Sequence, residues 1–148
     1  LSFDFKTTEN ANGGIKYFFT TYKNGGPLGL EYQILDDEKN FERKAGINGN
    51  HRCAALYDMF PPRKGRTLHP VGQWNTGKII SKNKHVEHWL NGEKVLEFER
   101  LGAEYLSALA KSKYRDAVPV FGSVPEGRIL LQFHGDVVFF KNIKIREL

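Results

Sequence analysis

Short runs in which apolar and polar residues alternate occur along the whole chain, and turn-forming residues separate them. The chain opens with such a run, in which Leu1, Phe3 and Phe5 alternate with polar residues. Because successive side chains of a strand point to opposite faces, this alternation is typical of strands buried on one side. Asn91-Gly92 is the strongest hairpin signal, since a type I′ turn needs positive φ at both central residues.

The alternating runs predict about ten short strands in one all-β domain. We expect strands over residues 1–6, 15–21, 28–35, 53–59, 74–81, 84–90 and 94–99, and two more within residues 127–148. Residues 102–114 carry apolar side chains at helical spacing and predict the one convincing helix, whereas 36–50 predicts a loop with one short helical turn. Many short strands without an internal repeat favour a jelly-roll sandwich of two antiparallel sheets.

Charge and composition exclude several classes of function. The net charge is +5, but basic residues are interleaved with acidic ones and form no compact stripe with stacking aromatics, which argues against nucleic-acid binding. The single cysteine, Cys53, cannot form an internal disulfide, and no apolar run is long enough to span a membrane. The chain begins inside a strand pattern without Met, so we expect a domain over 1–148 that lacks its N-terminal strand or strands.

The closing segment, residues 127–148, contains two apolar runs around a polar turn at residues 134–136. This pattern predicts two strands joined as a hairpin. Gln132 and His134 then share one face of the first strand, opposite the residues expected in the core, which are Ile129, Leu131 and Phe133.

The same parity argument applies to two earlier strands. In residues 28–35, Leu30, Tyr32 and Ile34 are expected to face the core, which leaves Glu31 and Gln33 on the other face. In residues 15–21 the same rule leaves Lys16 and Phe18 outside. If these strands share a sheet, its outer face collects five polar side chains, which are Lys16, Glu31, Gln33, Gln132 and His134.

Six segments, in order and over nearly the whole chain, carry a family resemblance. They are ANGGIKYF (11–18), LEYQILDD (30–37), HRCAALYDM (51–59), PVGQWNTGKII (70–80), VEHWLNGEKVLEFE (86–99) and ILLQFHGDVVFFKNIKIREL (129–148). On these segments the chain resembles the 3-keto-disaccharide hydrolase domain family. The resemblance implies a concanavalin-like jelly roll with a sugar cleft on its concave sheet, a periplasmic or secreted location, and activity on glycosides oxidised to a ketone at C3.

A ketone at C3 acidifies the C2 proton, so the aglycone at C1 can leave by elimination, after which water adds back. Such chemistry needs a base near C2, an acid near the glycosidic oxygen and a group that stabilises the enolate. A divalent metal is one such group, although the sequence has no clear ligand motif and leaves the cofactor open. On the family segments, the expected catalytic residues are Glu31 and His134, and the expected substrate contacts are Lys16, Gln33, Asp36, Tyr57, Trp89 and Gln132.

Each of these residues also has a structural interpretation. Glu31 and Gln33 fit an ordinary solvent-facing strand, Asp36 fits a turn cap, and Tyr57 fits either the core or a sugar platform. Trp89 faces away from the core, and is available for sugar stacking, if its strand neighbours Val86, His88 and Leu90 are buried. In that case His88 is a core histidine with a hydrogen-bond partner rather than a catalyst.

Two departures from the family pattern bear on the activity. Relatives commonly carry an acid where this chain has Phe133, directly before the His134-Gly135 pair, and they often carry Arg near Phe18. Two alternatives to an enzyme therefore stay open: a non-catalytic carbohydrate-binding module, and an interaction domain of a larger surface protein.

Overall fold

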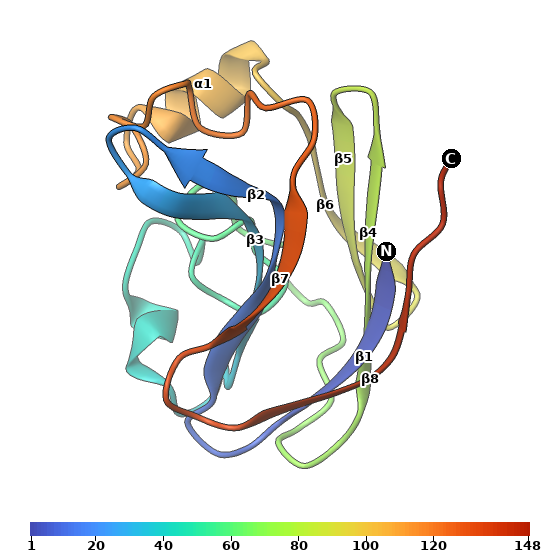
Figure 1. Cartoon of the computed structure of the whole chain (residues 1–148). Helices are drawn as coiled ribbons and strands as arrows, with labels where there is room; N and C mark the ends of the chain where they lie inside the picture. The colour runs from blue at the N-terminus through green and yellow to red at the C-terminus, as the bar shows by residue number, and fades with distance from the viewer.

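The computed structural model describes residues 1–148 as two antiparallel sheets packed face to face (Figure 1). The five-stranded sheet has the order β6-β5-β4-β1-β8, with β1 (Ser2–Thr7), β4 (Asn75–Lys82), β5 (His85–Leu90), β6 (Glu93–Glu99) and β8 (Val138–Lys144). The three-stranded sheet has the order β3-β2-β7, with β2 (Asn12–Tyr22), β3 (Gly26–Leu35) and β7 (Arg128–Phe133). This arrangement confirms the predicted all-β sandwich.

Two short helical elements accompany the sheets. The single turn η1 (Phe41–Lys44) lies in the loop after β3, as predicted, and α1 (Ala103–Leu109) follows β6. The helix ends at Leu109, five residues before the predicted end, and turns occupy the following residues. No helix has the length and apolar character needed to cross a membrane.

The alternating residues of both sheets fill the space between them. Phe3 and Phe5 of β1 and Ile15 of β2 are fully buried in one core cluster. Phe3 contacts Tyr32 of β3 edge to face, with 5.2 Å between the ring centres. Each strand therefore presents one apolar face to the core and leaves the other free for other contacts.

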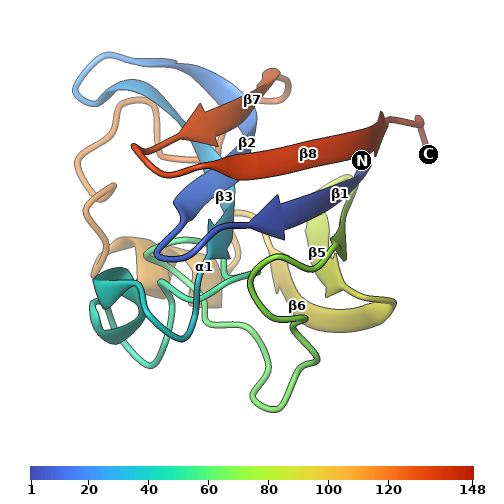
Figure 2. The same ribbon diagram turned by 90° about the horizontal axis from the view of Figure 1, so that it is seen from below.

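The closing segment does not form the predicted hairpin. β7 pairs with β2 in the three-stranded sheet, whereas β8 pairs with β1 in the five-stranded sheet (Figure 2). The connection from β1 to β2 crosses between the sheets at the same place, and Thr8 donates to the Val137 carbonyl through its N–H at 3.3 Å and its Oγ1 at 2.9 Å. The hairpin prediction was wrong because each closing strand completes a sheet by pairing with a strand from the start of the chain.

The apolar residues of β7 are less buried than predicted. Leu131 pairs with the core residue Ile15, which places it on the inner face. Yet Ile129, Leu131 and Phe133 are 42%, 45% and 75% exposed. The prediction of which face these residues occupy was right. The prediction that they are buried in the core was wrong, because β7 is an edge strand of the smaller sheet.

The predicted strand over residues 53–59 is a series of turns that lies along the edge of β3. The Ala54 N–H donates to the Gln33 carbonyl at 2.8 Å, and the Tyr57 N–H donates to the Glu31 carbonyl at 3.0 Å. Ala54 and Asp58 have positive φ values of 69° and 62°, which interrupt the extended backbone. This segment therefore borders the sheet that carries Glu31.

Candidate functional site

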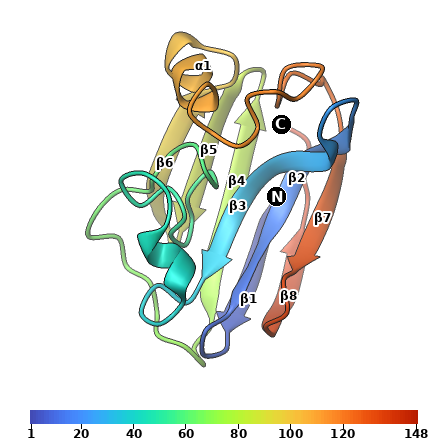
Figure 3. The same ribbon diagram turned by 90° about the vertical axis from the view of Figure 1, so that its left-hand side faces the viewer.

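The outer face of the three-stranded sheet brings together four of the predicted residues. β2 lies between β3 and β7 (Figure 3). Strand register pairs Lys16 with Glu31, and pairs Gly14 with Gln33 on one side and with Gln132 on the other. Directly paired residues of antiparallel strands point to the same face, so Lys16, Glu31, Gln33 and Gln132 are neighbours. The distant strands thus meet as the parity argument anticipated.

Glu31 is the buried charge of this face. Glu31 is only 4% exposed. Its carboxylate lies over Gly14, and a Cβ at that position would be 2.6 Å from Glu31 Oε1. Burial raises the pKa of Glu31, and the Lys16 ammonium, 3.7 Å from its Oε2, opposes part of that shift. A carboxyl whose pKa is displaced toward neutrality is suited to proton transfer.

Two amide side chains share the outer face with Glu31. The amide of Gln33 is fully buried and lies 3.1 Å from Glu31 Oε1, close enough to donate a hydrogen bond to it. The Oε1 atom of Gln132 is buried and has no hydrogen-bond partner. Because buried acceptors are nearly always paired, this oxygen is suited to a donor supplied by a ligand, such as a sugar hydroxyl.

His134 lies just beyond the end of β7 and is exposed. It is close enough to Glu31 that its positive form lowers the pKa of that carboxyl. His134 therefore borders the same face, but it makes no direct hydrogen bond to the other predicted residues.

A second polar cluster, which the sequence did not predict, adjoins Glu31 through Tyr57. His51 Nδ1 lies 2.8 Å from Glu42 Oε2, and His51 Nε2 lies 2.9 Å from Asp58 Oδ1. The Tyr57 hydroxyl donates to the same Glu42 oxygen at 3.3 Å, and the His51 and Tyr57 rings are 4.4 Å apart. We call Glu42, His51, Tyr57 and Asp58 the histidine cluster.

The carboxylates of the histidine cluster favour the charged form of His51. Burial alone would lower the pKa of His51, but the hydrogen bonds to Asp58 and Glu42 outweigh burial and raise it. Burial raises the pKa of Tyr57, and the Glu42 carboxylate raises it further. The sequence showed His51 only as one polar loop residue, since nothing local indicates that Glu42 and Asp58 fold onto its two ring nitrogens.

Asp36 caps a turn instead of facing the other predicted residues. Its Oδ1 accepts the N–H groups of Glu38 at 3.0 Å and Lys39 at 3.2 Å, and its Oδ2 accepts that of Asn10 at 2.8 Å. The carboxylate is therefore engaged by the backbone, as in the capping interpretation, and its predicted sugar contact has no support in this geometry.

Trp89 faces away from the core, as expected, but it lies on the opposite side of the sandwich from Glu31. It lies on β5, in the five-stranded sheet, with Lys78 Nζ 4.0 Å from its ring centre and its Nε1 donating to Glu87 at 2.7 Å. The prediction that Trp89 stacks on the sugar held by Glu31 is wrong, because the two residues lie on the outer faces of different sheets. His88 is a core histidine, as expected: it is fully buried between Tyr17 and the Ala54 carbonyl.

One group of three side chains has ligand atoms that could share a single metal ion, and it lies in the five-stranded sheet, away from Glu31. Atoms of His85, Glu87 and Glu97 fall within 4.8 Å of one another on the outer face of the five-stranded sheet. Lys94 Nζ lies 3.4 Å from Glu87 and 2.7 Å from Glu97, so these carboxylates already have a counter-ion. Phe133, which follows Gln132 on β7, offers no ligand atom.

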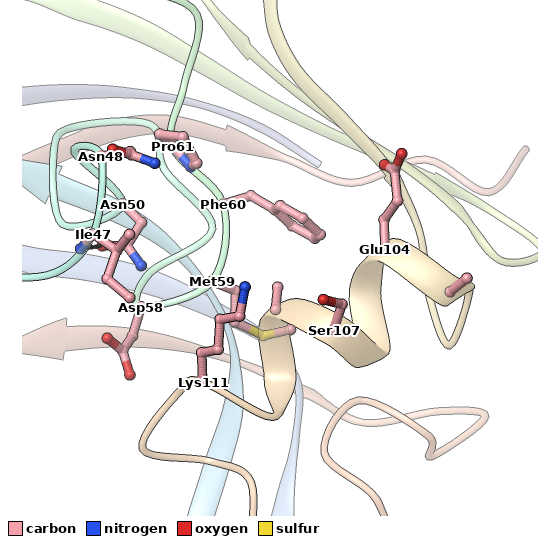
Figure 4. A pocket seen from close by; sticks show the side chains of 12 residues that line it. Ile47, Asn48, Asn50, Asp58, Met59, Phe60, Pro61, Glu104, Ser107 and Lys111 are labelled. Atoms are coloured by element: carbon pink, nitrogen blue, oxygen red, sulfur yellow. Dashed lines mark hydrogen bonds between the residues drawn. The ribbon is translucent and has the colours of Figure 1, made fainter.

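A pocket of about 540 Å³ lies between the loop of residues 47–61 and α1 (Figure 4). Asp58 of the histidine cluster lines it, together with Met59, Phe60 and Lys111. None of the predicted site residues lines this pocket.

Comparisons with known proteins agree on one family. Residues 1–146 match the model of the 3-keto-alpha-glucoside-1,2-lyase-like domain. A curated 3-keto-disaccharide hydrolase from Bacteroides thetaiotaomicron is 32% identical over 170 aligned residues, which include all of this chain and 58% of that protein. The chain thus spans well under two thirds of that relative's length.

Two crystal structures from Parabacteroides distasonis, each described as a "putative glycosyl hydrolase", share the fold. The first has a TM-score of 0.81 and 29% identity, and the match covers 95% of this chain and 67% of that one. The second has a TM-score of 0.78 and 28% identity, and covers 99% of this chain and 76% of that one.

Proposed function

The chain belongs to the 3-keto-alpha-glucoside-1,2-lyase-like domain family, and on this premise we propose that it cleaves glycosides whose sugar carries a ketone at C3. The observation that carries the proposal is the outer face of the three-stranded sheet. There, a buried carboxyl with a raised pKa, Glu31, lies beside the Lys16 ammonium, and the same face carries the unpaired Oε1 of Gln132. The Glu31 carboxyl is suited to remove a proton, and the Lys16 ammonium to stabilise negative charge. The Gln132 oxygen is suited to accept a hydrogen bond from a sugar hydroxyl.

In the proposed reaction, Glu31 removes the C2 proton, and the electron pair of the C–H bond forms an enolate toward the C3 oxygen. The Lys16 ammonium stabilises the enolate oxygen, because a fixed positive charge favours the developing negative charge. The enolate then expels the aglycone oxygen from C1, and that oxygen takes a proton from an acid. His134, at the exposed border of the face, is the proposed acid.

Hydration completes the cleavage. Water adds at C1 of the resulting enone, and a proton returns to C2, which restores the ketone and gives net hydrolysis. Gln33 and Gln132 are proposed to orient the sugar through its hydroxyl groups, since neutral amides both donate and accept hydrogen bonds. Tyr57, which adjoins Glu31, is proposed to contact the ring.

The test is release of the aglycone from a chromogenic 3-keto-glucoside by the wild-type chain. Glu31→Gln keeps the size of the side chain but removes the base, so we expect turnover to fall about 100-fold or more. His134→Ala should also lower turnover, most strongly for aglycones that are poor leaving groups. Glu147→Gln, an exposed carboxylate near the C-terminus, is the matched control and should retain wild-type turnover.

A non-catalytic carbohydrate-binding module is the second candidate, and Phe133 favours it, because the family resemblance leads us to expect an acid at that position. Binding of the 3-keto-glucoside without release of the aglycone would support this alternative and contradict the proposed reaction. The periplasmic or secreted location implied by the resemblance remains a prediction.

A further inference from the structure

A pocket of about 880 Å³ lies beside the histidine cluster, and its charged side chains are all basic. It is formed by η1 with the turns that follow it and by residues 61–66, both beyond the β3 edge of the three-stranded sheet (Figure 3). The cationic lining residues are Arg43, Lys44, Arg52, Lys64 and Arg66, and no Asp or Glu lines the pocket.

Most of these cations have no ion-pair partner. Arg66 is paired with Asp37, and its Nε donates to the Cys53 carbonyl at 3.1 Å. The other four cations form no ion pair and no side-chain hydrogen bond. The Nε of Arg43 is buried without an acceptor, although buried donors are nearly always paired.

One glycine of the pocket lies against an arginine side chain. Gly49 has a φ of 86°, and a Cβ there would lie 3.3 Å from Arg52 Cδ, so the arginine side chain packs against the glycine. Like charges in one concavity repel each other and raise the local concentration of anions. Four unpaired cations around a buried, unused donor therefore indicate a site for an oxyanion, since guanidinium groups match oxyanion geometry.

We propose that this pocket binds an oxyanion, whether sulfate, phosphate or carboxylate, carried on a carbohydrate. Among the lining residues no side chain is aromatic, so the pocket offers no stacking platform for a nucleobase. The identification of the carrier as a carbohydrate rests on the proposed function, whereas the anion site itself rests only on the unpaired cations.

The pocket and the histidine cluster share one loop. Arg43 follows Glu42 in the chain, and Arg52 follows His51, so one loop supplies both the histidine cluster and the pocket. A glycan whose ketone-bearing sugar lies at Glu31 extends past Tyr57 toward the cations. The proposed substrate class is therefore a 3-keto-glycoside with an anionic aglycone.

Isothermal titration calorimetry at fixed ionic strength tests the site. The probes are sucrose octasulfate, digalacturonate and glucose 6-phosphate for the three oxyanions, with sucrose and a dT oligonucleotide for comparison. We expect at least one anionic sugar to bind and sucrose not to bind. The double variant Arg43→Gln/Arg52→Gln should bind that sugar about tenfold more weakly or worse, because it loses two charge-assisted contacts.

The control is Arg115→Gln/Arg146→Gln, which removes the same charge from two exposed positions outside the pocket. An equal loss of affinity in both doubles, no binding of any anionic sugar, or tighter binding of the oligonucleotide would overturn the proposal. Should the first double fail to fold by circular dichroism, Lys44→Gln/Lys64→Gln replaces it, since both lysines are exposed.

Turnover of a neutral 3-keto-glucoside by the wild-type chain is measured in parallel. Anion binding without turnover would contradict the proposed reaction and leave the anion site standing. Turnover without anion binding would overturn the anion site alone.

Discussion

At the scale of single residues, two buried titratable groups respond to their surroundings in different ways. Glu31 lies on the outer face, and burial raises its pKa even though Lys16 is close. His88 lies in the core, where burial lowers its pKa to about 4. The first group is costly to keep charged at neutral pH, which agrees with its proposed role in proton transfer, and the second is a neutral element of the core.

Glu31→Gln should stabilise the fold at neutral pH while it removes turnover. Because the folded-state pKa of Glu31 is raised, its contribution to stability is present below the unfolded pKa and is lost as pH rises through the folded pKa. The variant cannot ionise, so its melting temperature should exceed that of wild type at pH 7 and match it near pH 4. Thermal melts across this range check the prediction, and a less stable variant at pH 7 would contradict it.

His88→Gln should reduce the sensitivity of the fold to acid. The pKa of His88 is lowered, so its contribution to stability is present above the unfolded value of 6.5 and is lost as pH falls toward the folded value of about 4. The wild type should lose about 3 kcal/mol more than the variant across that window, by the ordinary free energy per pKa unit. Urea unfolding of both chains at pH 7 and pH 4 measures the difference, and parallel losses would refute the assignment.

At the scale of elements, close approaches between neighbouring strands position the candidate site. Gly14 of β2 leaves room for the Glu31 side chain of β3. The β1–β2 and β7–β8 connections cross between the sheets together and are joined at Thr8 and Val137. Strand geometry and strand connections therefore fix where β7, with Gln132, lies against β2.

Gly14→Ala tests the position of the Glu31 carboxylate. The new methyl group would lie 2.6 Å from Oε1, so the carboxylate must move. We expect kcat to fall by up to about 100-fold, because a misplacement of about 1 Å can cost that much, with a smaller change in KM. Steady-state kinetics on the chromogenic 3-keto-glucoside provides the readout. An unchanged kcat would show that the position of Glu31 does not matter for the reaction.

Thr8→Val should lower the stability of the fold, because it weakens the contact between the β1–β2 and β7–β8 connections. The variant keeps the backbone N–H bond to Val137 but loses the Oγ1 bond, which has a length of 2.9 Å. The expected loss is about 0.5–1 kcal/mol in the free energy of unfolding, since the bond is exposed. Thr21→Val, an exposed strand threonine without a side-chain bond, is the control and should lose less. Equal effects in both variants would mean that the Oγ1 bond contributes nothing.

At the scale of the whole molecule, the chain passes between the two sheets four times. The crossings are β1 to β2, β3 to β4, β6 to β7 and β7 to β8. A single core cluster of 22 buried residues joins both sheets. Neither sheet can therefore lose its structure without exposing the inner face of the other.

Unfolding should accordingly be a single cooperative transition. Trp74 and Trp89 lie beside and within the five-stranded sheet, so tryptophan fluorescence reports mainly on that sheet. Far-UV circular dichroism reports on both sheets. We expect the two probes to give the same urea midpoint, whereas separate midpoints would show that the sheets unfold independently.

The sequence by itself determined the local features of this protein. Alternation fixed the face on which each side chain lies, so Lys16, Glu31, Gln33 and Gln132 could be predicted to share one face. The alternation of side chains between the two faces of a strand is a property of the backbone and does not depend on which strand pairs with it. It could therefore be predicted from the sequence alone. The family could also be recognised, because its segments recur in order.

Only the tertiary structure decided how the faces are paired and covered. It assigned β7 and β8 to different sheets, left Phe133 exposed, placed Trp89 on the far side and enclosed His51 between Glu42 and Asp58. These outcomes depend on contacts between residues far apart in the chain, and alternation is the same whichever partner a strand takes. The sequence therefore nominated the residues of the site, and the packing of the two sheets decided which of them meet.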